Sequence, residues 1–226
     1  MKIAKKLFYL IRKKIKPSRL LYEVIKKTKS KQLSVIRTKS IYDKEGATNL
    51  NEYDQLKIYD DHKKFFDERL EPGKEKTLLD FGCGTGRYLE IQKNYKKVYL
   101  VDISKHNLLI ASKNADKLKI DHSLIKKSLF GINMNIDIFF SVGVFGQSYP
   151  FDEKVVKKIY SLLNKNGTGL FTVKLTDQFS HEPLSLNEDK VKDILRNFNF
   201  LIEIRNFKGV NKINESFCIV SLFRDQ

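Results

Sequence analysis

The sequence predicts a doubly wound α/β fold, in which a mostly parallel sheet is covered by helices on both faces. From Gly73 onward, short apolar runs with the composition of strands alternate with segments of helical periodicity. Because neighbouring parallel strands need a crossover, usually a helix, this alternation is typical of a parallel sheet. The five runs in this part lie at 77–81, 98–101, 123–126, 136–141 and 168–174.

The C-terminal part departs from this alternation. It is predicted to contain a helix from about Asn187 to Asn197 and then two further strands, at 200–207 and 216–223. These two strands are close enough in sequence to pair as a hairpin through residues 208–215. Together with the five earlier runs, they predict a sheet of seven strands.

The N-terminal region is predicted to be helical. Residues 1–16 place apolar side chains on one face of a helix that a proline ends, and a second short helix follows. A third helix spans roughly residues 51–71 and stops at Pro72-Gly73. We therefore predict a basic helical arm at 1–50 and one folded domain at 51–226, because 226 residues with 41% hydrophobic content can form one sizeable core.

Positive charge is concentrated in this arm. Residues 1–40 contain 14 Lys or Arg and a single acid, Glu23, a local charge of +13 in a chain whose net charge is +16. Such an arm can lie on an anionic membrane surface, or it can bind the phosphates of RNA. It can also pack its apolar face on the domain and leave its lysines in solvent. The sequence leaves all three interpretations open.

The composition excludes several protein classes. No run approaches the ~18 apolar residues of a membrane-spanning helix, and lysines occupy the place of an export signal's apolar stretch. We therefore expect a cytoplasmic protein, either free or peripheral to the inner face of a membrane. Cys83 and Cys218 should be reduced thiols, and no metal-ligand spacing is present, so we expect no metal site. Cys83 is interpreted as a small packing residue rather than a nucleophile.

A glycine-rich loop directly follows the first predicted strand. Gly82, Gly84 and Gly86 lie after Asp80 and before a helix that begins near Arg87. Glycine accepts φ > 0 and lets a ligand come close to the backbone, so the loop is predicted to bind a ligand. The dinucleotide fingerprint places its third glycine one residue later, which argues against a pyrophosphate ligand.

Two acids accompany the loop. Asp102 ends the second predicted strand, where a carboxylate can accept both hydrogen bonds from a ribose cis-diol. Asp80, at the tip of the first strand, can bind an ammonium group directly or through water. The predicted cofactor is therefore an amino acid joined to a nucleoside.

These segments resemble the class I S-adenosylmethionine-dependent methyltransferases. The residues that carry the resemblance are Leu79-Asp80-Phe81-Gly82-Cys83-Gly84-Thr85-Gly86 and Leu100-Val101-Asp102-Ile103-Ser104, and it covers roughly residues 51–226. It implies an antiparallel last strand inserted beside the fifth, and S-adenosylmethionine as cofactor with S-adenosylhomocysteine as product. Asp80 and the glycines would face its methionine part, Asp102 the ribose and Ile103 the adenine. The full expected cofactor set is Asp80, Gly82, Cys83, Gly84, Gly86, Asp102, Ile103, Ser128, Leu129 and Ser141.

The sequence departs from the family pattern after two strands. The family commonly places an acid after the third strand for the adenine amino group, whereas here the Ser128 hydroxyl or the Leu129 backbone must serve. After the fourth strand, members that methylate nucleobase amines often carry Asn or Asp followed by two prolines. Residues 141–147 lack that motif, which disfavours methylation of exocyclic base amines and leaves this stretch as a wall of the site.

The sequence offers fewer candidates for binding the methyl acceptor than for binding the cofactor. His181 follows the fifth strand and is the candidate general base, with an ordinary loop histidine as the alternative. Tyr53 and Tyr59 lie on the helix that often covers the cofactor in this family, and they could instead pack in the core. With Phe145 and Gln147, they form the expected substrate-binding set.

The resulting functional hypothesis is methyl transfer to an oxygen of a small molecule or of a cell-envelope glycan intermediate. The alternatives are an RNA methyltransferase of the cap type and a catalytically silent cofactor-binding partner subunit. A contact with a membrane or with RNA would be made through residues 1–40, and for RNA the stretch from Phe145 to Pro150 would also be relevant. The sequence leaves the oligomeric state open.

Overall fold

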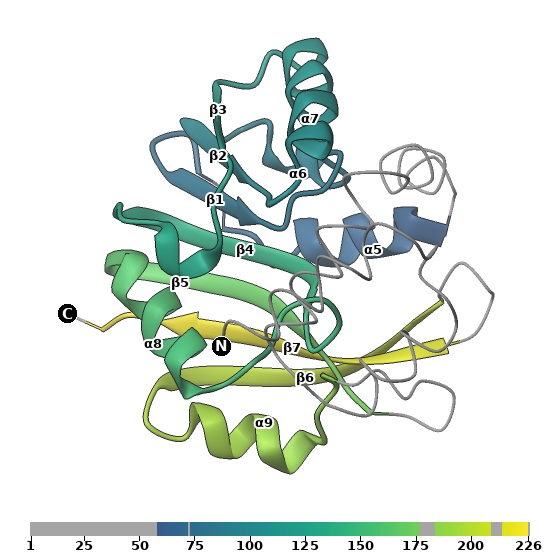
Figure 1. Ribbon diagram of the computed structural model, residues 1–226, viewed down its shortest axis with the longest axis vertical. Coiled ribbons are helices and arrows are strands. Elements are labelled where there is room, and N and C mark those ends of the chain that lie inside the picture. The colour runs from purple at the N-terminus through teal and green to yellow at the C-terminus, as the bar shows by residue number, and fades with distance from the viewer. Residues whose placement is uncertain (1–57, 72, 177–183, 209–213, 226) are drawn as a thin grey trace, which may run out of the picture.

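The computed structural model describes residues 58–71, 73–176, 184–208 and 214–225 (Figure 1). These residues form one seven-stranded sheet in the order β3-β2-β1-β4-β5-β7-β6. All neighbouring strands are parallel except β7, which is antiparallel to both β5 and β6. The predicted doubly wound sheet with an antiparallel last strand beside the fifth is therefore confirmed. The predicted basic helical arm at 1–50, the domain boundary after residue 50 and Tyr53 lie outside the described residues.

The elements follow one another closely along the chain. The strands are β1 (Thr77–Phe81), β2 (Lys97–Val101), β3 (His122–Ile125), β4 (Ile136–Phe145), β5 (Leu163–Lys174), β6 (Asn199–Lys208) and β7 (Asn214–Phe223). The helices are α5 (Ile58–Asp67), α6 (Leu89–Gln92), α7 (Lys105–Lys117), the 3-10 helix η2 (Leu129–Gly131), α8 (Glu153–Leu162) and α9 (Glu188–Leu195).

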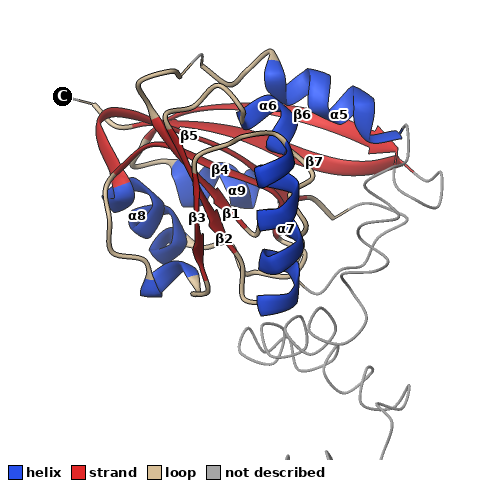
Figure 2. Cartoon of the chain, turned by 90° about the horizontal axis from the view of Figure 1, so that it is seen from above, coloured by secondary structure: helices blue, strands red, loops and turns tan. Residues whose placement is uncertain are grey.

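Helices cover both faces of the sheet, which explains why its central strands are apolar on both sides. On one face, α8 and α9 contribute Val156, Ile159 and Leu195 to a core that includes Phe139 and Phe171. On the other face, α5, α6 and α7 contribute side chains to a second core, among them Phe66, Leu89 and Ala111. Figure 2 shows α8 on one side of the strands and α5 and α7 on the other.

Three helices begin at polar caps that could be recognised in the sequence. The side chains of Ser104, Asp152 and Asn187 accept hydrogen bonds from the backbone N–H groups of Asn107, Val155 and Lys190. Such caps typically contribute about 1 kcal/mol each. They explain why α7, α8 and α9 begin where they do.

Two strands are longer than predicted. β4 continues beyond residue 141 to Phe145 through a bulge, where Gly143 takes φ of +73° and its N–H donates to Thr172 Oγ1 at 2.8 Å. β5 begins at Leu163 rather than at Thr168. Among its first residues, Asn166 is left-handed, with φ of 61°.

The helix after the glycine loop is also shorter than its neighbours. It starts at Leu89 instead of Arg87 and ends at Gln92. The reason is that the loop continues as a series of tight turns, in which Gly86 N–H bonds to Cys83 O and Leu89 N–H bonds to Gly86 O. α6 therefore contributes a single turn of helix directly after the loop.

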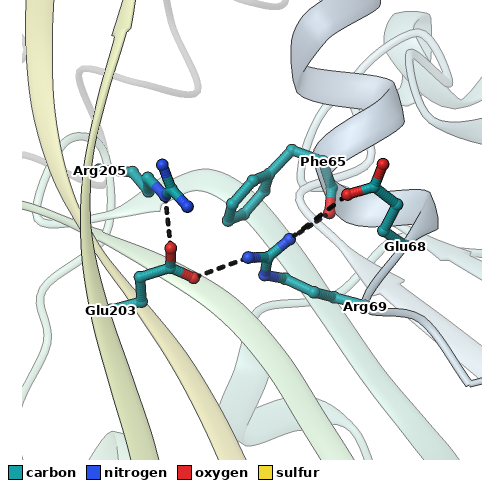
Figure 3. A network of polar contacts seen from close by, with 5 residues as sticks. All are labelled: Phe65, Glu68, Arg69, Glu203 and Arg205. Atoms are coloured by element: carbon teal, nitrogen blue, oxygen red, sulfur yellow. Dashed lines mark hydrogen bonds and ion pairs between the residues drawn. The ribbon is translucent and has the colours of Figure 1, made fainter.

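A polar network holds α5 to the C-terminal hairpin (Figure 3). Arg69, just after α5, donates to Glu203 Oε2 of β6 at 2.9 Å and to the carbonyl oxygen of Phe65 at 3.1 Å. Arg205 donates to the other carboxylate oxygen of Glu203. The guanidinium carbon of Arg69 lies 3.6 Å from the centroid of the Phe65 ring. These contacts fix the position of α5 over one face of the sheet.

Candidate functional site

The glycine loop after β1 has a backbone that only glycine adopts readily. Gly82 and Gly84 have φ of +74° and +55°. A Cβ on Gly82 would lie 2.3 Å from Cγ2 of Val144, in the bulged part of β4. The N–H groups of Gly82 and Cys83 both bond to the carbonyl oxygen of Val101 at the end of β2, at 2.8 and 3.1 Å. The loop is thus tied to β2 on one side and closed by β4 on the other.

Asp102 follows β2 and is bonded directly to this loop. Its Oδ2 accepts from Gly84 N–H at 3.1 Å and its Oδ1 from Ser104 N–H at 2.7 Å. Burial raises the pKa of Asp102, and these two hydrogen bonds oppose that shift. The Asn107 side chain and the Ile103 backbone also lower this pKa through hydrogen bonds, so the donors to Asp102 are all neutral groups.

Asp80 lies in β1 and is almost completely buried, with 2% of its surface exposed. Its Oδ2 accepts a hydrogen bond from Gln92 Nε2 at 2.8 Å. Burial raises the pKa of Asp80 to about 7, the Gln92 hydrogen bond opposes the shift, and the nearby Asp102 charge adds to it. A cation bound beside Asp80 would favour the ionised carboxylate.

The first half of α5 reaches the same end of the sheet. The ring of Tyr59, which is buried, lies 3.8 Å from the guanidinium carbon of Arg87, the residue that follows the glycine loop. His62 is 5.2 Å from the Tyr59 ring and 4.2 Å from the Phe207 ring of β6, measured between centroids. The structure therefore brings Tyr59 beside the loop, as expected for a helix that covers it.

The two residues predicted to contact adenine, Ser128 and Leu129, differ in their exposure to solvent. Ser128 is exposed and precedes η2, where its side chain makes no capping hydrogen bond. Leu129 has no exposed surface, so its side chain belongs to the core. Ile103 is half-buried directly after Asp102. A large exposed ring, Phe130 at 55%, lies beside them.

The end of β4 is held by Ser141 and Phe145. The Ser141 hydroxyl donates to the carbonyl oxygen of Phe81 at 2.8 Å, which joins β4 to the end of β1. Phe145 is fully buried among aromatic rings, with the Phe81 centroid 5.8 Å away. Gln147 is only half-buried, so in this stretch it is the predicted residue whose side chain reaches solvent.

An ion pair that the sequence analysis did not identify lies at the end of β5. The Lys174 side chain has no exposed surface, and its Nζ lies 3.5 Å from Oε2 of Glu215 in β7. The same Nζ is 4.9 Å from the centroid of the Phe217 ring. A lysine at the end of an apolar run could have indicated a buried cation from the sequence, but its partner Glu215 is far away in sequence.

His181, the predicted general base, lies outside the described residues.

Other chemistry finds little support in the described part of the chain. Burial raises the pKa of the Cys83 thiol well above its ordinary value, which agrees with a packing role. No group of three or more potential metal-ligating side chains occurs among the residues that the structure describes. No helix within those residues is long and apolar enough to cross a membrane.

Comparison with known proteins identifies related domains. A family model described as a methyltransferase domain matches residues 72–203. No curated protein is significantly similar to the chain.

Solved structures share the fold at low sequence identity. Magnesium protoporphyrin IX methyltransferase from Synechocystis PCC 6803 with bound SAH is 14% identical, with a TM-score of 0.63 over 85% of this chain and 100% of that one. A SAM dependent methyltransferase from Aquifex aeolicus is 17% identical, with a TM-score of 0.58 over 78% and 97%. TehB from Haemophilus influenzae is 16% identical, with a TM-score of 0.59; the match covers 74% of this chain but only 62% of TehB.

The raised pKa of Asp80 predicts how stability depends on pH. Because the folded state binds this proton more tightly than the unfolded state, the Asp80 contribution to the free energy of unfolding is largest at low pH. It should be lost as the pH rises towards about 7. Urea unfolding of the wild type and of Asp80→Asn, compared at several pH values, should show a difference that falls by up to about 1.4 kcal/mol per pH unit. A difference that stays constant would contradict the shift.

Proposed function

The chain belongs to the methyltransferase domain family, and on that premise we propose that it methylates a hydroxyl group of a small molecule or of a cell-envelope glycan intermediate. The family and the fold confirm the predicted class I methyltransferase, with S-adenosylmethionine as the cofactor of that family. The choice of a hydroxyl acceptor is our proposal.

One observation carries the assignment of the cofactor site. Two buried carboxylates flank a glycine loop, and their hydrogen bonds come from neutral groups. The Gln92 amide donates to Asp80, and the donors to Asp102 include the Gly84 and Ser104 N–H groups. None of these donors cancels the charge of a carboxylate, so a cationic ligand can favour the ionised form of Asp80. Asp80 fits the ammonium group of the cofactor, and Asp102 fits its ribose hydroxyls.

The cofactor, when bound, supplies a methyl group made electrophilic by its sulfonium. The protein's residues need to orient the acceptor and exclude water, which can lower the barrier by about 7–11 kcal/mol in favourable cases. We assign this role to Tyr59 on α5 and to the segment from the end of β4 to Gln147. The supporting contacts are those of Tyr59 with Arg87, directly after the glycine loop, and of Val144 with Gly82. A strong base is not required, and we retain His181 as the candidate that would take the hydroxyl proton.

The end of β5 favours a neutral acceptor. Lys174 is the fully buried cation there, and Glu215 opposes its charge at 3.5 Å. Such a pair creates little attraction for a chain of phosphates. The missing Asn-Pro-Pro or Asp-Pro-Pro motif at 141–147 also disfavours base amines. The runner-up, an RNA methyltransferase, rests on the +13 charge of residues 1–40. A catalytically silent partner subunit would bind cofactor without turnover.

Loss of the Asp102 carboxylate should weaken the cofactor site. Calorimetry should show micromolar binding of S-adenosylmethionine and S-adenosylhomocysteine to the wild type. In Asp102→Ala the dissociation constants should rise by roughly 100-fold, because two hydrogen bonds to a charged acceptor are removed. Asp116→Ala, which removes an exposed carboxylate of α7, should bind as the wild type does. A folded wild type that binds neither compound would exclude the enzyme assignment.

The acceptor class can be tested by following the methyl group. The full chain is incubated with radiolabelled S-adenosylmethionine and, separately, with hydroxyl-bearing small molecules, glycan intermediates and capped RNA. We expect label in a small-molecule or glycan fraction, at a rate that changes little between about 50 and 200 mM salt, because the acceptor is not held by phosphate contacts. Label that enters only RNA, and is lost at the higher salt, would establish the runner-up instead.

A further inference from the structure

Gln92 is a polar side chain in a place that an apolar one would fill. It is the last residue of α6 and has no exposed surface, and the same helix contributes Leu89 to the core. Its Oε1 is buried and has no hydrogen-bond partner in the described part of the chain. A buried, unpaired amide oxygen destabilises the folded state. The amide therefore has a cost that a methionine of similar size would avoid.

The hydrogen bond described for this amide goes to the proposed cofactor site. Gln92 Nε2 donates to Asp80 Oδ2 at 2.8 Å. Because Asp80 accepts this bond through Oδ2, Oδ1 remains for a ligand. A side chain with a donor at this point fixes the orientation of the Asp80 carboxylate.

The neutrality of the donor is as important as its position. The charge of Asp102 raises the pKa of Asp80, and the charge of Asp80 in turn raises the pKa of Cys83 and of Tyr88. The nearby cation, Arg87, lowers the pKa of Tyr88. Lysine or arginine in place of Gln92 would cancel the charge of Asp80. An amide supports the ionised carboxylate and leaves its net charge available to a cationic ligand.

We propose that Gln92 is a positioning residue for the amino-acid end of the cofactor, and that it acts by holding the Asp80 carboxylate toward the cofactor's ammonium group. This inference rests on the proposed function, since it assumes the same ligand. It adds a residue to the site that lies outside the glycine motif.

Two ligands separate this role from a general effect on folding. S-adenosylhomocysteine carries the amino-acid end, whereas 5′-methylthioadenosine has the nucleoside without it. By calorimetry, Gln92→Met should weaken S-adenosylhomocysteine binding by about tenfold or more, because a hydrogen bond to a charged group is lost. Binding of 5′-methylthioadenosine should change by less than about twofold. Ile159→Val, in the core on the opposite face, controls for a small loss of stability.

A second variant distinguishes hydrogen bonding from packing. In Gln92→Glu, two adjacent buried carboxyl groups share one proton near neutral pH, so a donor and one net negative charge are both retained. This variant should bind S-adenosylhomocysteine within a few fold of the wild type near pH 7 and lose affinity as the pH rises towards 9. Gln92→Met should remain weak throughout. If packing alone mattered, Gln92→Met would be the better tolerated of the two.

The possible results are distinct. If the wild type binds neither ligand, the proposed function fails and the inference fails with it. If the wild type binds both, the proposed function stands, and the inference is overturned by either of two results. One is that Gln92→Met binds S-adenosylhomocysteine as the wild type does; the other is that it loses both ligands equally. Should Gln92→Met fail to fold, loss of S-adenosylhomocysteine binding by Gln92→Glu at pH 7 would overturn it.

Discussion

Two carboxylates, Asp80 and Asp102, are buried at the ends of adjacent parallel strands, and the site is organised around that constraint. Removing an ionised carboxylate from water costs several kcal/mol unless hydrogen bonds or an opposite charge compensate it. Here the hydrogen bonds come from an amide and from backbone N–H groups, all of them neutral. The pKa of each carboxyl group is raised accordingly. A ligand with an ammonium group and two hydroxyls would supply a positive charge for Asp80 and further hydrogen bonds for Asp102.

The parallel sheet makes this pairing possible. Asp80 lies opposite Leu100 in the β1–β2 register and Phe81 opposite Val101, so Asp102 comes one residue beyond the paired strands. The glycine loop then crosses from β1 towards β2 and bonds to the Val101 carbonyl oxygen. On the other side, the Ser141 hydroxyl joins β4 to Phe81. The loop is consequently fixed from both neighbouring strands, and its open backbone is presented at the carboxyl edge of the sheet, where α/β folds bind ligands.

The sequence predicts the features that depend on local pattern. Strand and helix periodicity predicted all seven strands, and the spacing of glycines and acids predicted the loop and the position of Asp102 beside it. Several boundaries differed from the prediction. β4 continues past residue 141, where the Gly143 N–H donates to Thr172 of the next strand, and this is a contact with a distant segment. β5 begins at Leu163 rather than at Thr168. α6 begins late for a local reason, because the glycine turns continue to Leu89.

The contacts missed at the site are those between distant segments. In the sequence, Gln92 is an ordinary polar residue of a predicted helix, and only the fold brings it within hydrogen-bond distance of Asp80. Lys174 likewise forms an ion pair with a glutamate on a different strand. Phe145 was predicted to contact substrate because it follows the expected fourth strand at 136–141. β4 instead continues through a bulge to Phe145, and the ring of Phe145 is fully buried. These arrangements depend on strand order and on the bulge, which hydrophobic periodicity does not encode.

The most direct test of the central role of Asp80 is the proton balance of cofactor binding. S-adenosylhomocysteine binding is measured by calorimetry near pH 6.5 in buffers of different ionisation enthalpy. If the ligand's ammonium binds the ionised carboxylate, a substantial fraction of a proton should be released per molecule bound, because the pKa of free Asp80 is about 7. The release should vanish near pH 8.5 and in Asp80→Asn. A binding enthalpy independent of the buffer at pH 6.5 would contradict the account.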